Sequence, residues 1–349
     1  MGLGFRDGFG LGGRVGLGFD GLEVVVLGEP VLDRYVEGNT ERISREAPVL
    51  VVRETRRRVH LGGAANAAAN LADLGATVTL VGWVGDDPDG ETLKTELRRA
   101  GITDRTVALP GRATPTKTRF VAGALQTRKQ QMLRVDRGSR NPGPEGLDAI
   151  GTALASVWDR AAVLVVSDYG DGTGTERFAA WARKARSRGC TVVVDSRYAL
   201  DAYPEVSAAT PNQPEAEAAL GQALSSVEAA LSGAERLRDR LGLQGLVLTR
   251  GREGLVAVGA GKEQIHEPAV GGEAVDVTGA GDTVTAVVAL AQAAGWSWAR
   301  TARAANLAAA RVVRHLGPAT CSAADLQADL ETAEAKPCPS SGLSDGRSR

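Results

Sequence analysis

Short apolar runs alternate with amphipathic stretches along most of the chain. Apolar runs predict buried strands at residues 23–28, 77–82, 162–167, 191–195 and 245–249. Helical spacing of apolar residues predicts helices at 64–74, 91–100, 147–157, 175–188, across 215–241, and at 284–294. Strands that alternate with helices at this spacing indicate βαβ units. The sequence therefore predicts an α/β fold with a doubly wound, mostly parallel central sheet and helices on both faces.

Four further segments do not follow this rhythm. Polar and apolar residues alternate at about 35–39 and 48–53, and again at 116–121 and 130–136, the last two joined by a polar turn near 126–129. A period of two is typical of strands with one solvated face. We expect a small β-sheet, separate from the central one, that forms a flap. The arginines at 56–58 are interpreted as a solvated face of this sheet.

Composition and charge limit the partners. The chain has 349 residues and a net charge of −1, which gives no general attraction to nucleic acid or an anionic membrane. Its three cysteines have neither metal-binding nor disulfide spacing, which favours a reducing, cytoplasmic location. The Gly-rich residues 1–21 and the Pro/Ser/Gly-rich residues 333–349 are predicted to be disordered tails around one domain at 22–332.

The octet at residues 276–283 (DVTGAGDT) is the strongest candidate for chemistry. It follows an expected extended segment and enters a helix. Gly279, Ala280 and Gly281 allow backbone amides to crowd around an anion, and the first turn of a helix offers free N–H groups there. Asp282 would repel that anion, so we interpret it as a base that takes a proton from an attacking hydroxyl. The alternative is a tight turn with Asp282 as a helix cap.

Other polar residues fall where predicted strands end, and they are weak signals one by one. A doubly wound sheet binds ligands at the carboxyl edge of its strands. We expect that edge to gather Asp33, Ser167-Asp168-Tyr169, Asp195, Asn212 with Glu215, Thr249-Arg250-Gly251, and the turn at 279–282. The run Gly259-Ala260-Gly261-Lys262-Glu263 lacks the residues of a phosphate-binding P-loop and is predicted to be a hairpin turn.

Three motifs in a fixed order give the chain a family resemblance. Gly62-Gly63-Ala64-Ala65-Asn66 and residues 276–282 resemble the two signatures of the ribokinase-type (PfkB) sugar kinases. Asn212-x-x-Glu215 between them is similar to that family's N-x-x-E motif, and the resemblance covers about residues 23–330. Within the family, the chain most resembles the kinase domain of the D-glycero-β-D-manno-heptose-7-phosphate kinases of ADP-heptose synthesis. That likeness rests on the runs at 28–35, 43–49, 116–119 and 130–136.

The resemblance implies a fold, a reaction and a set of residue roles. The fold would be ribokinase-like, with a β lid from segments at about 35–60 and 114–136. The reaction would be ATP-dependent phosphorylation of the anomeric C1 hydroxyl of the heptose 7-phosphate, with Asp282 as base and Gly279, Ala280 and Gly281 as anion hole. Nucleotide-binding residues would be Asn212, Glu215, Thr249, Gly251 and Asn306, and Glu215 would hold Mg²⁺ through water. Substrate-binding residues would be Asp33, Gly62, Gly63, Asn66, Lys117, Arg134, Asp195 and Arg197.

The resemblance also implies partners: ATP and Mg²⁺, with a monovalent cation as a further candidate, a homodimer formed through the lid, and a separate nucleotidyltransferase downstream. Two departures concern the sugar. Asp171 and Arg197 stand where the heptose kinases usually have lysines, which changes charge and phosphate-binding geometry. Two alternatives stay open: a PfkB-type kinase of another small sugar, sugar phosphate or nucleoside, and a non-catalytic sugar- or nucleotide-binding regulator on the same fold.

Overall fold

A nine-stranded sheet forms the centre of the computed structural model, which describes residues 16–123, 129–139, 141–170, 174–261, 263–272 and 274–335. The strand order is β13 (Gln264–Glu267), β12 (Leu255–Gly259), β11 (Gly245–Thr249), β10 (Ala208–Ala209), β9 (Thr191–Ser196), β8 (Val163–Asp168), β1 (Glu23–Gly28), β4 (Thr77–Gly85) and β5 (Thr103–Leu109). All neighbours are parallel except the pairs that involve β12. The chain order reverses between β1 and β8, so a switch point lies there.

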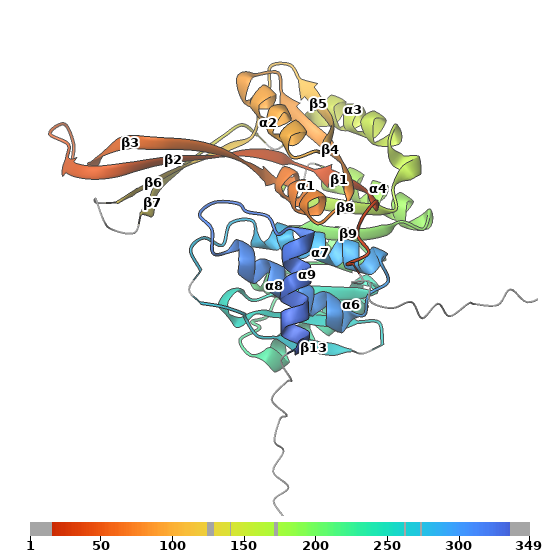
Figure 1. Cartoon of the computed structure of the whole chain (residues 1–349). Coiled ribbons are helices and arrows are strands. Elements are labelled where there is room, and N and C mark those ends of the chain that lie inside the picture. The colour runs from red at the N-terminus through yellow and green to blue at the C-terminus, as the bar shows by residue number, and fades with distance from the viewer. Residues whose placement is uncertain are drawn as a thin grey trace, which may run out of the picture.

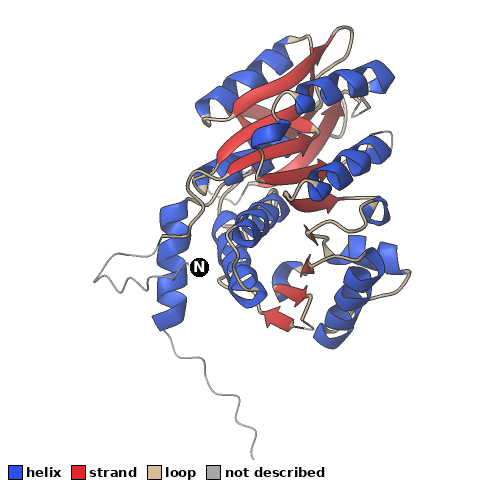
Figure 2. Ribbon diagram, turned by 90° about the vertical axis from the view of Figure 1, so that its right-hand side faces the viewer, coloured by secondary structure: helices blue, strands red, loops and turns tan. Residues whose placement is uncertain are grey.

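Helices cover both faces of this sheet (Figures 1 and 2). Successive residues of β1 show why: Val24 and Val26 join one apolar core, and Val25 and Leu27 join the other. The first core is covered by α1 (Ala64–Asp73), α2 (Pro88–Arg99), α7 (Ala280–Ala293), α8 (Trp298–Val312) and α9 (Ala323–Ala335). The second is covered by α3 (Gly143–Ala155), α4 (Thr175–Ser187), α5 (Gln213–Leu220) and α6 (Val227–Leu241). Burial of both faces explains the unbroken apolar strands in the sequence.

A second sheet of four strands forms the lid and extends away from the central sheet (Figure 1). Its order is β3 (Leu50–Gly63), β2 (Pro30–Ile43), β6 (Thr116–Gly123) and β7 (Gln130–Arg137). The predicted flap segments are thus strands, but β2 and β6 pair in parallel, which the alternation alone could not indicate. Only Glu29 separates β1 from β2, and β3 leads directly into α1. The lid is therefore rooted at the edge of the central sheet where the switch point lies.

Gly63 makes this junction possible. Its φ is 55°, and a Cβ at this position would come within 2.5 Å of the Glu29 carbonyl oxygen. A residue with a side chain would be strained by its backbone and would collide with the chain crossing from β1 to β2. The Gly-Gly pair before α1 is thus needed to join lid and core, besides any role it has toward a ligand.

The predicted boundaries are wrong in several places. Residues 16–21 belong to the folded domain, because Leu17 and Phe19 are buried and the Phe19 ring lies 5.0 Å from that of Trp296. At the other end, α9 continues to Ala335, past the predicted boundary at 332. The octet at 276–283 follows a loop and not a strand.

Among the described residues no helix is long and apolar enough to cross a bilayer. Residues 1–15, 336–349, 126–128, Asp171 and Lys262 lie outside the described ranges.

Candidate functional site

A cavity of about 410 Å³ opens at the carboxyl edge of the central strands, between them and the root of the lid. Most of the residues predicted from sequence line it: Asp33, Gly62, Gly63, Asn66, Lys117, Arg134, Asp195, Arg197, Asn212, Glu215, Thr249, Gly279, Gly281 and Asp282. These come from both sheets and from α1, α5 and α7. The structure therefore gathers at one place side chains that lie up to 249 positions apart in sequence (282 − 33).

The start of α7 forms the anion-binding part of this cavity. Gly279 caps the helix with φ 87°, and the first intrahelical bond runs from the Thr283 N–H to the Gly279 carbonyl at 3.1 Å. The N–H groups of Gly281 and Asp282 consequently have no backbone partner one turn back among the described residues. A Cβ at Gly281 would meet nothing within 4 Å, so the backbone is open on the cavity side. The Ala280 N–H donates to Val277 at 3.3 Å, and the Ala280 side chain is not among the cavity lining.

Asp282 lies in the first turn of α7 and is 5% exposed. Its two oxygens accept from different elements: Oδ2 from the Asn66 amide at 2.6 Å and Oδ1 from the Tyr169 hydroxyl at 2.8 Å. Burial raises the pKa of Asp282 to about 6, while these hydrogen bonds oppose the rise. A carboxylate with a pKa close to neutral can take and release a proton at neutral pH.

The turn before α7 is held to the lid. The Asp276 carboxylate accepts from the Thr278 N–H and hydroxyl at 2.9 and 2.7 Å, and from the Gly317 N–H at 3.0 Å. It also accepts from the hydroxyl of Tyr35 on β2 at 3.3 Å. Despite its burial, Asp276 has a pKa below its usual value because these donors stabilise the charged form. Asp276 thus shapes the turn and is not a free base.

Asp33 is not at the end of a central strand, as predicted, but inside lid strand β2. It is buried and paired with Arg119 of β6, whose Nη1 lies 2.6 Å from its Oδ1. The other oxygen lies over Gly62, where a Cβ would be 2.5 Å from it. Arg119 also lines the cavity and was missed as a site residue. The only signal in the sequence was its place in the run at 116–119.

The Asn66 side chain lines the cavity and also bonds to the carboxylate of Asp282. Its Nδ2 is the donor in that bond, and Asn70 one turn later accepts from the Thr283 hydroxyl at 2.7 Å. Two asparagines at i and i+4 on α1 therefore fix the start of α7. Sequence reasoning expected Asn66 to bind a sugar hydroxyl; the structure adds a positioning contact that the spacing could not show.

Acidic residues dominate the part of the cavity beside α5. Asn212 and Glu215 form a reciprocal cap on α5, each side chain 2.9 Å from the other's N–H. Burial raises the pKa of Glu215 and, more strongly, that of Asp195, which also faces Asp282 and Glu215. Carboxylate and amide oxygens are ligands that suit Mg²⁺, which is usually held by one or two carboxylates together with phosphate oxygens. The residues present therefore fit the ion, and the described residues contain no cluster of three or more metal ligands that would form a protein-only cage.

Two predicted nucleotide residues lie outside the cavity lining. Asn306 on α8 donates to the Pro268 carbonyl at 2.7 Å and so holds the loop after β13. Gly251 begins the 3₁₀ turn η3 (Gly251–Glu253) after β11, where nothing lies within 4 Å of its Cβ position. Thr249, by contrast, lines the cavity.

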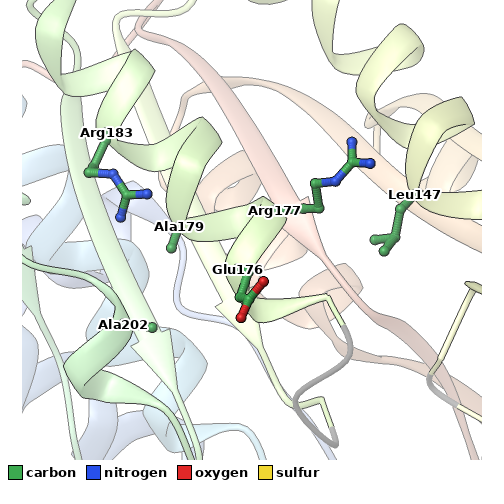
Figure 3. A pocket seen from close by; sticks show the side chains of 6 residues that line it. All are labelled: Leu147, Glu176, Arg177, Ala179, Arg183 and Ala202. Atoms are coloured by element: carbon green, nitrogen blue, oxygen red, sulfur yellow. The ribbon is translucent and has the colours of Figure 1, made fainter. Parts of the chain in front are cut away.

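A larger hollow, of about 560 Å³, lies over α4, α3 and the 3₁₀ turn η2 (Leu200–Ala202) (Figure 3). Its lining includes Glu176, Arg177 and Arg183 but none of the predicted site residues. The strand-end acids and the start of α7 face the smaller cavity. Volume alone is therefore a poor guide here, and we place the candidate site in the cavity of Asp282.

Comparison with known proteins gives consistent matches. The model of the pfkB family carbohydrate kinases matches residues 22–325. "Bifunctional protein HldE" of Caulobacter vibrioides is 41% identical over 325 residues, which is 91% of this chain and 65% of that protein. "Bifunctional protein HldE" of Geobacter sulfurreducens is 40% identical over 315 residues, 88% of this chain and 63% of the relative. The chain spans just under two thirds of the length of these relatives.

Solved structures confirm the predicted fold. Phosphofructokinase-2 from Escherichia coli, in complex with substrates and products, superposes with a TM-score of 0.75 at 20% identity, over 90% of this chain and 99% of that one. The ribokinase of Arabidopsis thaliana, complexed with ribose and ATP, gives 0.69 at 22% identity, over 89% and 99%. At such identities the likeness establishes the fold alone.

Proposed function

The chain belongs to the pfkB family of carbohydrate kinases, and from this premise we propose that it phosphorylates the anomeric C1 hydroxyl of D-glycero-β-D-manno-heptose 7-phosphate to the 1,7-bisphosphate. ATP is the phosphoryl donor. The observation that carries the proposal is the buried Asp282 carboxylate, with its pKa raised to about 6, beside the open amides of the α7 start.

The residues suit an in-line transfer. Asp282 takes the proton of the C1 hydroxyl as that oxygen bonds to the γ-phosphorus and the bond to the ADP oxygen breaks. Charge on the transferring group develops next to Gly279, Ala280 and Gly281, where the helix start offers N–H groups and partial positive charge. Such a transfer needs positioning and charge stabilisation more than covalent catalysis.

The sugar is assigned to the side of the cavity below the lid. Asp33, fixed by Arg119, presents its second oxygen over Gly62, and Asn66 lines the same cavity. Lys117 and Arg134 of the lid and Arg197 after β9 supply positive charge for the 7-phosphate. Arg197, which stands where the heptose kinases usually have a lysine, thus lines the cavity. An arginine binds phosphate as a planar fork, whereas lysine is a point charge.

The nucleotide is assigned to the side of α5, β11 and α8. Asn212 and Glu215 would hold Mg²⁺ through water, Thr249 and Gly251 would contact the nucleotide, and Asn306 would fix the loop beside it. Held there, Mg²⁺ would supply positive charge that neutralises the negative charge developing on the phosphate groups. Asp195 lies between the two sides and would accept from a substrate hydroxyl.

We also propose a homodimer through the lid and a nucleotidyltransferase as the partner that uses the product. Lid strands and the β2–β3 connection expose apolar side chains that a second copy would cover: Ile43, Val49, Leu50, Met132, Leu133 and Val135. Large exposed apolar side chains are typical of a surface that another protein covers. The relatives are bifunctional proteins, which is in keeping with a second activity linked to the kinase step.

A substrate panel with coupled ADP detection tests the sugar assignment, and phosphorus NMR reads the position that is phosphorylated. We expect ADP release with heptose 7-phosphate and a new anomeric phosphate signal. Preferential turnover of an unphosphorylated sugar or a nucleoside would contradict the substrate and support the kinase alternative. Tight binding without ADP release for every compound would instead support the regulator.

A further inference from the structure

Tyr169 directly follows β8 and has no role in the function proposed above. Its hydroxyl donates to Asp282 Oδ1 at 2.8 Å, opposite the bond from Asn66 to Oδ2. We propose that Tyr169 is a positioning residue that holds the Asp282 side chain in one orientation and stabilises its ionised form. The inference rests on the proposed role of Asp282 as base.

The surroundings of Tyr169 keep its hydroxyl in place as a donor. Burial raises the pKa of the phenol well above its usual value, and the neighbouring carboxylate of Asp282 adds to this effect. The hydroxyl therefore keeps its proton over the whole range in which an enzyme works. The Lys117 ammonium lies 5.8 Å from the ring centroid, so the lid contacts the ring while the hydroxyl reaches the carboxylate.

Asp282 needs such donors because its neighbours disfavour a negative charge. The charged and titratable groups that line this cavity come from both sheets and from α5: Asp33 of β2, Lys117 and Arg119 of β6, Arg134 of β7, Asp168 of β8, Asp195 and Arg197 of β9 and its end, and Glu215 of α5. Burial and Asp33 raise the pKa of Asp282, and Asn66, Tyr169 and Lys117 lower it. In the part of the chain that the structure describes, Asn66 and Tyr169 are the two groups that bond directly to the carboxylate.

A matched control lies nearby. The Tyr203 hydroxyl donates to Asp168 Oδ2 at 2.7 Å, so here too a tyrosine hydroxyl is bonded to a buried aspartate of the same cavity. Tyr203 does not line the cavity and does not contact Asp282. Removing its hydroxyl is the same chemical change at a site that should leave Asp282 unaffected.

The direct test is a titration that needs no substrate. The full chain is labelled with ¹³C at the aspartate carboxyl carbons, and the Asp282 signal is identified by its loss in Asp282→Asn. We expect Tyr169→Phe to move the titration midpoint of this signal upward by about one pH unit, since each donor to a carboxylate lowers its pKa. Tyr203→Phe should leave the midpoint in place. An unchanged midpoint in Tyr169→Phe, or an equal change in both variants, would overturn the proposal.

Two additions keep the test decisive. Replacing Tyr169 with 3,5-difluorotyrosine, a stronger donor of nearly the same shape, should lower the midpoint and covers the case in which Tyr169→Phe does not fold. The acid limb of the kcat/KM profile should move in the same directions as the titration. Normal turnover in Asp282→Asn would refute the base, whereas a static midpoint would refute only the role of Tyr169.

Discussion

Two buried carboxylates of one cavity, Asp168 and Asp282, are surrounded very differently. They are 3% and 5% exposed, respectively. Among the described residues, Asp168 accepts from four donors: the Gly170 N–H and the hydroxyls of Thr175, Ser196 and Tyr203. Asp282 accepts from two side chains, Asn66 and Tyr169. The fuller shell joins β8 to α4, β9 and the turn after it. The smaller one leaves lone pairs of Asp282 available to a ligand.

This difference separates a structural carboxylate from a chemical one. A buried charge with a complete set of donors stabilises the segments that supply them. A buried carboxylate with few donors favours its neutral form, which is why the pKa of Asp282 is raised to about 6. Asp168 lies at the end of a strand and Asp282 at the start of a helix. Both are positions where ligand-binding residues occur, so position alone could not distinguish the two roles.

The largest expected effect comes from Asp282→Asn. Loss of the base should reduce kcat by about 10²- to 10⁴-fold, the usual contribution of a general base. ATP should bind with nearly unchanged affinity, because the backbone amides at the α7 start remain. Steady-state kinetics and nucleotide titration measure the two quantities. If Asp282→Asn retains most of its kcat, Asp282 is not the base and does not differ in role from Asp168.

Asp168→Asn should act mainly on folding. Replacing one carboxylate oxygen by an amide group leaves the Gly170 N–H facing a donor and weakens the other bonds. We expect the free energy of unfolding to fall by about 2 kcal/mol. Denaturant titration followed by circular dichroism measures it. If the free energy of unfolding is unchanged while kcat falls sharply, Asp168 takes part in catalysis and is not a purely structural carboxylate.

Gly279→Ala should have a smaller effect on turnover. The φ of 87° strains any side chain, and the new Cβ would lie 2.6 Å from Asn66 Nδ2, the group that holds Asp282. We expect kcat to fall roughly tenfold, equivalent to about 1.4 kcal/mol of transition-state stabilisation. Gly295→Ala, just past α7, is the control, since its φ of 75° imposes a similar backbone strain while nothing lies within 4 Å of its Cβ position and it does not line the cavity. Equal losses in both variants would mean that the displacement of Asn66 is not the cause.

The fold followed from sequence because its strongest signals are local. Continuous apolar strands and amphipathic helices placed most of the central sheet, and period-two alternation located the lid. Strand β5, with its mixed pattern of burial, gave no clear signal and was missed. The ends of the domain were misplaced because Phe19 is buried by contact with Trp296, which is distant in sequence. Long-range contacts of this kind leave no local pattern.

The site was predictable as a set of positions but not as a set of contacts. Strand ends and the glycine turn named most of the cavity lining. Arg119 was missed because a charged residue on an alternating strand is typical of a solvated face, whereas this one is buried against Asp33. Tyr169 was noted at a strand end, but its bond to Asp282 depends on how β8 and α7 pack. Such pairings need the tertiary structure.

The pH dependence of stability tests the contrast between the two aspartates most directly. The pKa of Asp282 rises from 3.8 to about 6 on folding, so the stability that this group contributes is full below pH 3.8 and is lost as the pH rises through 6. Two pKa units correspond to about 3 kcal/mol, an upper bound on the gain at pH 7 when the charge is removed.

The measurement is the free energy of unfolding of wild type, Asp282→Asn and Asp168→Asn from pH 4 to pH 8, with kcat at pH 7. We predict that Asp282→Asn is more stable than wild type at pH 7 by about 1 to 3 kcal/mol. Its advantage should disappear toward pH 4, and it should be nearly inactive. Asp168→Asn should be less stable than wild type and active when folded. A loss of stability in Asp282→Asn that does not vary with pH, or retention of its turnover, would contradict the account.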